Sequence, residues 1–189
     1  MGACDHKNLI DGKIKRNVWL HKLLTENSAR CVGFDIDRES VEYCHAIGWN
    51  NIFLADMISE FHKVYPKIIG VPKWDYLVAG EIVEHLDNPV SFLQSLRTQY
   101  RDYISRIIIT VPNAFKILNA KFAIEGKECI NTDHRYWFTP YTICKVAHRA
   151  GFSIRELFYV GERNVVINNQ VLQLRNSAIS DDLILTADF

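Results

Sequence analysis

The chain alternates short apolar runs with longer stretches whose apolar residues recur at helical spacing. Apolar residues three or four positions apart predict a helix over residues 14–27. Residues 31–36 form a short, mostly apolar run, which is typical of a buried strand. Asp37 can cap a helix over residues 38–47, because its carboxylate accepts hydrogen bonds from the free N–H groups of the first turn, and Gly48 would end that helix.

The same alternation continues to the end of the chain. The run at 105–111 is apolar at most positions, as expected of a central parallel strand that is buried on both faces. Asn88 and Pro89 open a predicted helix, because proline suits the first helical turn. The remaining predicted elements are strands at 51–55, 75–79, 153–160 and 182–189 and helices at 57–65, 88–100 and 139–150. Residues 161–180 have no clear pattern.

Strands that alternate with helices predict an α/β fold, in which a doubly wound, mostly parallel, Rossmann-like sheet has helices on both faces. The last two predicted strands would form an antiparallel closing pair. No repeat or linker divides the sequence, so we expect a single domain over residues 1–189. Ligands of such sheets bind at the carboxyl ends of the strands. Those ends carry Asp35, Asp56, Gly80 and Glu81.

The composition narrows the classes of partner. The chain has 22 Lys and Arg residues against 22 Asp and Glu residues, and a net charge of zero disfavours nucleic acid or an anionic membrane surface as a partner. No apolar run reaches the length of a membrane span or a signal peptide, so we expect a cytoplasmic protein without membrane contact. The five cysteines include no Cys-x-x-Cys pair, and we expect no metal site.

Three stretches resemble motifs of the class I methyltransferases, which use S-adenosylmethionine. VGFDID at 32–37 resembles the family's second strand, which ends in an acidic residue. VAGEIVEHLDNP at 78–89 is similar to the fourth strand and the loop that follows it. HRYWFTP at 134–140, with AGF at 150–152, resembles the start and end of a late helix. The likeness covers about residues 2–152 and implies S-adenosylmethionine as the cofactor.

The resemblance implies which residues bind the adenosine part of the cofactor. Asp35 would accept hydrogen bonds from both ribose hydroxyls, and Ile36 would pack on the adenine ring. Asp56 would accept a hydrogen bond from the adenine amino group, with Met57 beside it. Each carboxylate also has a structural alternative. Asp35 could cap a helix, although Asp37 is better placed for that, and Asp56 could cap the helix that follows it.

The resemblance places the methionine part of the cofactor near the chain's first residues and the end of the third predicted strand. Gly2, Ala3 and Cys4 would flank its amino-acid end, and Gly80 and Glu81 would lie at its methionine portion. The family has a first strand and a glycine-rich turn before this point, but here only Gly2 matches the turn. We therefore expect the first strand of the fold to be missing. Either the chain is a fragment, or another segment fills the gap.

Two histidines in these motifs are candidate catalytic residues. His85 follows Glu84 beside the expected site of methyl transfer, and His134 precedes the late helix. An imidazole can accept a proton near neutral pH, so either histidine could activate the acceptor. The alternative is structural: His85 would pack against loop backbone, and His134 would orient the aromatic residues after it. An insertion at about 113–138 would contribute to the acceptor pocket.

Together these features predict an enzyme, an S-adenosylmethionine-dependent methyltransferase that acts on a small-molecule or carbohydrate-type acceptor. The sulfonium leaves as a neutral thioether, so alignment of acceptor, methyl group and sulfur can supply much of the rate. One alternative is a non-catalytic methyltransferase-like remnant that serves as a binding module. A nucleotide-binding oxidoreductase ranks lower, because the chain has no Gly-x-Gly-x-x-Gly segment.

Overall fold

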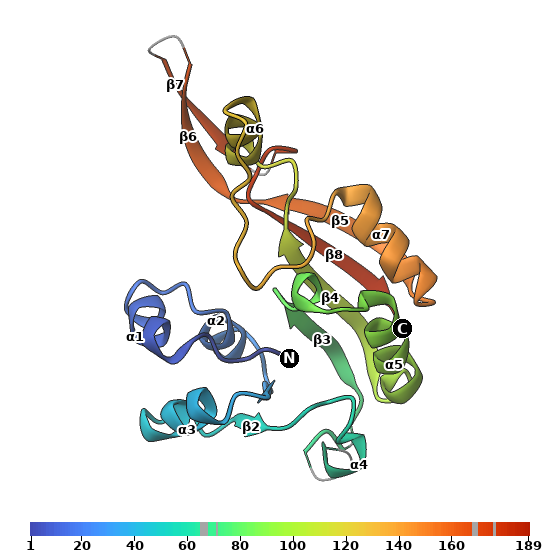
Figure 1. Cartoon of the computed structure of the whole chain (residues 1–189). Helices are drawn as coiled ribbons and strands as arrows, with labels where there is room; N and C mark the ends of the chain where they lie inside the picture. The colour runs from blue at the N-terminus through green and yellow to red at the C-terminus, as the bar shows by residue number, and fades with distance from the viewer. Residues whose placement is uncertain (65–67, 71, 168–169, 176) are drawn as a thin grey trace. The chain divides into compact units, whose positions relative to one another are not determined.

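A computed structural model describes residues 1–64, 68–70, 72–167, 170–175 and 177–189 (Figure 1). The chain falls into two units, Met1–Val71 and Pro72–Phe189. Each unit joins a pair of parallel strands through a crossover helix, which is the predicted α/β arrangement. Within the described residues, every helix is too short or too polar to cross a bilayer.

The first unit contains a two-stranded parallel sheet. β1 (Gly33–Asp35) runs beside β2 (Ile52–Leu54), with Phe34 opposite Phe53. The crossover helix between them is α3 (Arg38–Ala46). The other helices of this unit are α1 (Lys7–Lys15), α2 (Leu20–Glu26) and α4 (Phe61–Val64). Both predicted strands are confirmed, and each is shorter than the apolar run that predicted it.

The predicted ends of α3 are confirmed. The Asp37 carboxylate accepts a hydrogen bond from the Glu39 N–H at 3.2 Å and another from the Ser40 hydroxyl at 2.5 Å. Gly48 lies just beyond the helix with a φ of 96°, a left-handed conformation that glycine adopts without steric cost. Local side-chain chemistry therefore determines where this helix begins and ends.

Replacing Asp37 by alanine is expected to lower the free energy of unfolding by about 1 kcal/mol, because the first turn of α3 loses its side-chain acceptor. Urea unfolding of the variant and the parent chain measures the difference. The control is Glu42→Ala on the exposed face of the same helix, which should change stability by no more than about 0.5 kcal/mol. Equal losses in the two variants would contradict the capping role.

The predicted helix over residues 14–27 is wrong, because the chain breaks between α1 and α2. Asn17 has a φ of 56°, and the Val18 N–H bonds to the Lys13 carbonyl at 3.0 Å, which closes α1. The break directs the Trp19 side chain into the core, where only 1% of its surface is exposed. Burial of this large ring stabilises the break, and periodicity alone does not reveal such a tertiary effect.

The predicted helix over residues 57–65 is also too long. The Asp56 carboxylate first holds a separate turn through the N–H groups of Ile58 and Ser59, at 2.8 and 3.3 Å. α4 therefore begins only after that turn. Residue 65 lies outside the described residues.

The second unit contains a four-stranded mixed sheet in the order β3–β4–β8–β5 (Figure 1). β4 is parallel to β3, and β8 is antiparallel to both β4 and β5. The predicted antiparallel closing pair of strands is therefore confirmed. The elements are β3 (Trp74–Gly80), α5 (Pro89–Tyr100), β4 (Ile104–Pro112), α7 (Pro140–Arg149), β5 (Ser153–Val160) and β8 (Asp182–Asp188).

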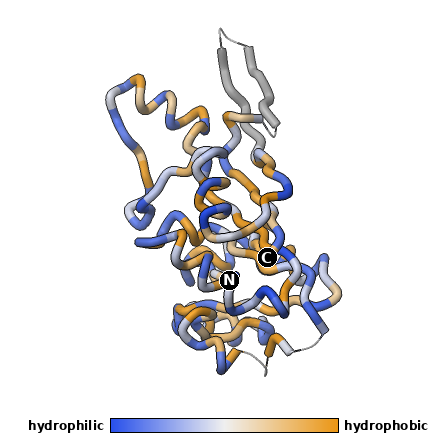
Figure 2. Tube along the Cα trace, turned by 90° about the vertical axis from the view of Figure 1, so that its right-hand side faces the viewer, coloured by the Kyte–Doolittle hydropathy of each residue, from blue (hydrophilic) through white to orange (hydrophobic). Residues whose placement is uncertain are grey.

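β4 lies between β3 and β8 and supplies the centre of this unit's core. Its Ile107, Ile109 and Val111 are fully buried, as the apolar run predicted. α5 is the crossover from β3 to β4, and its Leu93 and Leu96 are also fully buried. Figure 2 shows hydrophobic residues gathered around the strand that leads to the C-terminus. This packing holds the carboxyl end of β3, where predicted site residues lie.

Residues 113–138 leave the sheet and return to it, and a parallel bridge between the first and last residues of this segment closes it. The segment contains α6 (Ile117–Ile124), none of whose residues is fully buried. β6 (Glu162–Ile167) and β7 (Gln170–Arg175) form an antiparallel hairpin. The hairpin lies in the region where the sequence has no clear pattern, so it was not predicted.

Candidate functional site

The predicted site residues fall into two groups, one in each unit. In the first unit Asp35 ends β1, and its two carboxylate oxygens accept hydrogen bonds from the Cys4 N–H at 2.8 Å and the Asp37 N–H at 3.0 Å. The chain's first residues run along β1, since the Ala3 N–H donates to the Phe34 carbonyl at 3.2 Å. The structure thus brings together three of the predicted cofactor residues, Ala3, Cys4 and Asp35.

The described residues before α1 form no strand. Gly2 has a φ of 58°, so the chain turns there in a left-handed conformation. An ion pair between Lys13 and Asp5, at 2.5 Å, holds the segment that follows. Residues 1–6 therefore do not supply the first strand that the family resemblance implies.

A cavity of about 470 Å³ in the first unit is lined by Ile36 and Asp56. Ile36 is 76% exposed, so it offers an apolar side chain to a ligand, and Met57 is buried. The Asp56 carboxylate accepts from the Ile58 N–H and the Ser59 hydroxyl, both at 2.8 Å, so it holds the turn before α4 and does not cap the helix itself. Among the described residues, Asp56 Oδ2 accepts only the bond from the Ser59 hydroxyl and can accept a second one, and the cavity has the size of small-molecule sites.

In the second unit β3 ends at Gly80, and the next residue, Glu81, has a φ of 51°. A left-handed conformation is strained for residues other than glycine, and such strain clusters at functional sites. The Glu81 N–H donates to the Thr110 carbonyl at 3.1 Å, and the Thr110 hydroxyl donates to Glu81 Oε1 at 2.8 Å. The end of β4 therefore fixes both the backbone and the side chain of Glu81.

A short 3-10 helix, η1 (Val83–His85), is tied to the loop before α7. His85 Nδ1 donates to the Asp133 carbonyl at 3.0 Å, and the Arg135 N–H donates to the Glu84 carbonyl at 2.8 Å. The Arg135 guanidinium also donates to the His85 carbonyl. These bonds join two segments that lie about 50 residues apart in the sequence.

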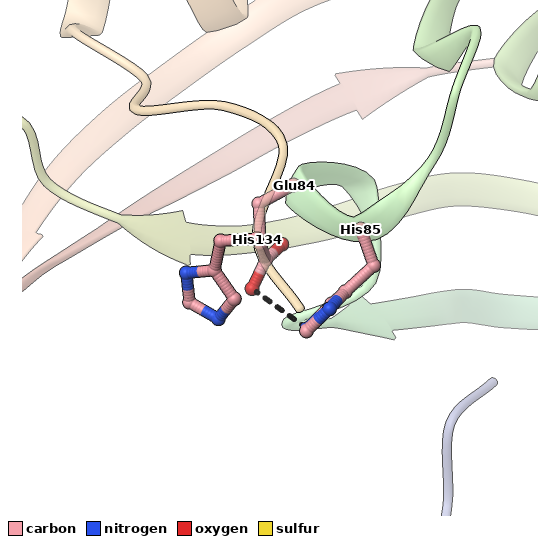
Figure 3. Close-up of side chains that lie close together, drawn as sticks. All are labelled: Glu84, His85 and His134. Atoms are coloured by element: carbon pink, nitrogen blue, oxygen red, sulfur yellow. Dashed lines mark ion pairs between the residues drawn. The ribbon is translucent and has the colours of Figure 1, made fainter. Parts of the chain in front are cut away.

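The two predicted catalytic histidines and Glu84 form one cluster (Figure 3). The rings of His85 and His134 lie edge to face, with centroids 4.6 Å apart. The Glu84 carboxylate lies between them, and its Oε1 is 3.7 Å from His85 Nε2. Sequence reasoning selected both histidines but not Glu84 as site residues. The signal that could have found it is a charged residue inside a run that is otherwise mostly apolar.

Glu84 is fully buried, and among the described residues no N–H or hydroxyl group donates to its carboxylate oxygens, which lie beside the Glu81 side chain. Burial and the negative charge of Glu81 raise the pKa of Glu84 to about 8. Burial, with the nearby charges of His85 and Lys116, lowers the pKa of His134. A buried carboxylate beside imidazoles can hold a proton or a cation. The sequence expectation of no metal rested on cysteine spacing, which says nothing about such a set.

No family model matches the chain. The ubiquinone biosynthesis O-methyltransferase of Aeromonas salmonicida (strain A449) is 23% identical over 146 residues, which are 73% of this chain and 60% of that protein. The chain thus spans about 60% of the length of this curated relative.

Solved structures of methyltransferases share the fold. A SAM-dependent methyltransferase from Archaeoglobus fulgidus, where SAM is S-adenosylmethionine, aligns over 97% of this chain and 94% of its own, with a TM-score of 0.59 and 18% identity. The small RNA methyltransferase HEN1 aligns over 82% of this chain and 20% of its own, with a TM-score of 0.56 and 14% identity. The chain has the class I methyltransferase fold, and its sequence is similar to that of a curated O-methyltransferase.

Proposed function

We propose that the chain binds SAM and transfers its methyl group to a small-molecule or carbohydrate-type acceptor. The observation that supports this most strongly is the end of β1, where the Cys4 N–H holds the Asp35 carboxylate at 2.8 Å. A carboxylate held in this way can accept both ribose hydroxyls in charge-assisted hydrogen bonds. The cavity lined by Ile36 and Asp56 in the same unit then takes the adenine ring, with Ile36 against its face.

The remaining cofactor residues are proposed from the motifs that contain them. Asp56 accepts from the adenine amino group, with Met57 beside it. Backbone groups of Gly2, Ala3 and Cys4 lie against the amino-acid end of SAM. Gly80 and Glu81 contact its methionine portion, and Glu81 is a suitable acceptor for the cofactor ammonium because its carboxylate is already held in place by Thr110.

The transfer itself needs an acceptor atom in line with the methyl group and the sulfonium. The acceptor forms a bond to the methyl carbon while the carbon–sulfur bond breaks, and S-adenosylhomocysteine leaves as a neutral thioether. Positioning supplies much of the rate in such a reaction. Where the acceptor is a hydroxyl or an amine, His134 or His85 is the proposed group that takes its proton.

The chemistry of the acceptor is proposed on two grounds. The curated relative is named for ubiquinone biosynthesis, so its acceptor is a small molecule. The net charge of zero gives this chain no general attraction for a polyanion. RNA is the competing class of acceptor, because the structural neighbour HEN1 is named as a small RNA methyltransferase.

S-adenosylhomocysteine is expected to raise the melting temperature of the 189-residue chain. A ligand at about 100 times its Kd adds about 2.7 kcal/mol to the free energy of unfolding, which shifts a protein of this size by several degrees. NADH at the same concentration is the control and should leave the melting temperature unchanged. A shift with NADH but not with S-adenosylhomocysteine would favour the oxidoreductase alternative and contradict the proposal.

Transfer of a labelled methyl group from SAM distinguishes a small-molecule acceptor from an RNA acceptor. Label that appears in a small-molecule extract, but not in RNA, is the expected result. Label in RNA alone would overturn the small-molecule assignment while leaving the methyltransferase assignment in place. Cofactor binding without transfer to either pool would favour the non-catalytic binding module.

A further inference from the structure

We propose that Glu84, His85 and His134 bind a divalent transition-metal ion. One ligand atom from each side chain lies within 4.8 Å of the others. Ligand atoms around a cation at bond lengths of about 2.1 Å lie about 3.0–3.4 Å apart. The separation between Glu84 Oε1 and His85 Nε2, 3.7 Å, is already close to that range. Small side-chain rotations therefore bring the three groups onto one ion.

The orientation of His85 suits a metal ligand. Its Nδ1 donates to the Asp133 carbonyl at 3.0 Å, so in the neutral ring the proton resides on Nδ1 and Nε2 carries the free lone pair. That Nε2 is the atom that faces Glu84. A hydrogen bond of this kind, from the second ring nitrogen to a carbonyl, is how metal-bound histidines are usually oriented.

Glu84 supplies the charge that a cation needs. Its carboxylate is fully buried, and among the described residues no N–H or hydroxyl group donates to either oxygen, while the neighbouring carboxyl group is that of Glu81. A buried carboxylate beside a second carboxylate is costly, and a cation removes that cost. The Arg135 guanidinium does not perform this role, because it bonds to the His85 carbonyl and pairs with Asp87 at 2.5 Å.

The loop that carries His134 is anchored independently of any ion. The Arg135 N–H donates to the Glu84 carbonyl at 2.8 Å, and the Tyr136 hydroxyl donates to the Asp87 carbonyl at 3.0 Å. These two bonds, from the residues that follow His134, hold it beside η1. The cluster is preorganised by groups that are not themselves ligands, which is expected of a built site.

The ligand set determines the class of ion. Two imidazoles and a carboxylate suit Mn²⁺, Co²⁺, Ni²⁺ or Zn²⁺, whereas Mg²⁺ and Ca²⁺ prefer oxygen ligands alone. Three protein ligands also leave coordination positions open for water. The site itself does not depend on the proposed function. Only the further step, in which an acceptor oxygen takes an open position, rests on it.

Co²⁺ binding to the chelator-treated chain tests the site directly. Equilibrium dialysis and the visible absorption of bound Co²⁺ are expected to show one ion per chain. His134→Ala and Glu84→Gln should each weaken binding at least about tenfold, while His148→Ala, an exposed histidine on α7, should leave it unchanged. An excess of Mg²⁺ should not displace Co²⁺, and displacement by Mg²⁺ would overturn the assigned class of ion.

Absence of Co²⁺ binding to the parent chain, or equal binding by the parent chain and His134→Ala, would overturn the site. His134→Ala keeps the test decisive if the buried Glu84→Gln variant fails to fold. The thermal shift with S-adenosylhomocysteine is measured in parallel. A thermal shift without Co²⁺ binding would overturn the metal site but not the proposed function. Co²⁺ binding without a thermal shift would overturn the proposed function but not the metal site.

Discussion

Asp35→Ala is expected to weaken S-adenosylhomocysteine binding by at least about 10- to 100-fold, because each of the two proposed hydrogen bonds to the charged carboxylate contributes about 1.5–3 kcal/mol. The carboxylate stands at the end of β1 and already accepts from the Cys4 and Asp37 N–H groups. Its loss removes the acceptor proposed for the ribose hydroxyls and also frees the segment that contains Cys4. Isothermal titration of the variant and the parent chain measures the change in Kd.

The matched control is Asp37→Ala, two residues further along the chain. Its carboxylate caps α3, so this variant should lose about 1 kcal/mol of stability but keep its affinity for S-adenosylhomocysteine. A similar loss of affinity in both variants would mean that the effect comes from the helix and not from the ribose contact. Unchanged affinity in Asp35→Ala would show that the second-strand motif has been placed on the wrong residue.

Trp19→Ala is expected to lower the free energy of unfolding by about 3–5 kcal/mol, the range for removal of a buried aromatic ring. Trp19 packs with Ile10, Val41 and Ile52, and it meets Trp49 edge to face with ring centroids 5.0 Å apart. Alanine would leave a cavity that these neighbours fill only in part. Urea unfolding monitored by circular dichroism measures the loss.

Val18→Ala provides the control for Trp19→Ala, because the two positions are adjacent in the same break between helices. Val18 is 53% exposed, and its truncation should change stability by no more than about 0.5 kcal/mol. A loss in Trp19→Ala that did not exceed the loss in Val18→Ala would contradict the core position of the tryptophan.

The candidate site could be predicted only in pieces. His85 and His134 were selected because each lies in a recognisable motif, and Asp35 because it ends an apolar run. The contact between the two histidine rings was not predicted, because the residues are nearly 50 positions apart in the sequence. It depends on Arg135, which bonds to the His85 carbonyl. Glu84 was missed because its importance comes from complete burial, which no local pattern reports.

The two errors in the helices have a common cause. Residues 14–27 carry a helical period, yet the chain breaks so that Trp19 can be buried. Residues 57–65 were expected to form one helix, yet the Asp56 side chain holds a turn first. In both places a side chain has a contact that is worth more than the next helical hydrogen bond.

The sequence by itself determined the strands of the two parallel pairs, the closing pair, the crossover helices and the ends of α3, because apolar runs and caps act over a few neighbouring residues. The family motifs likewise singled out Asp35 and both histidines. Only the tertiary structure decided which polar groups meet and what charge they can carry. Glu84 has a raised pKa because it is buried and because Glu81 is held beside it, and neither condition exists until the chain has folded.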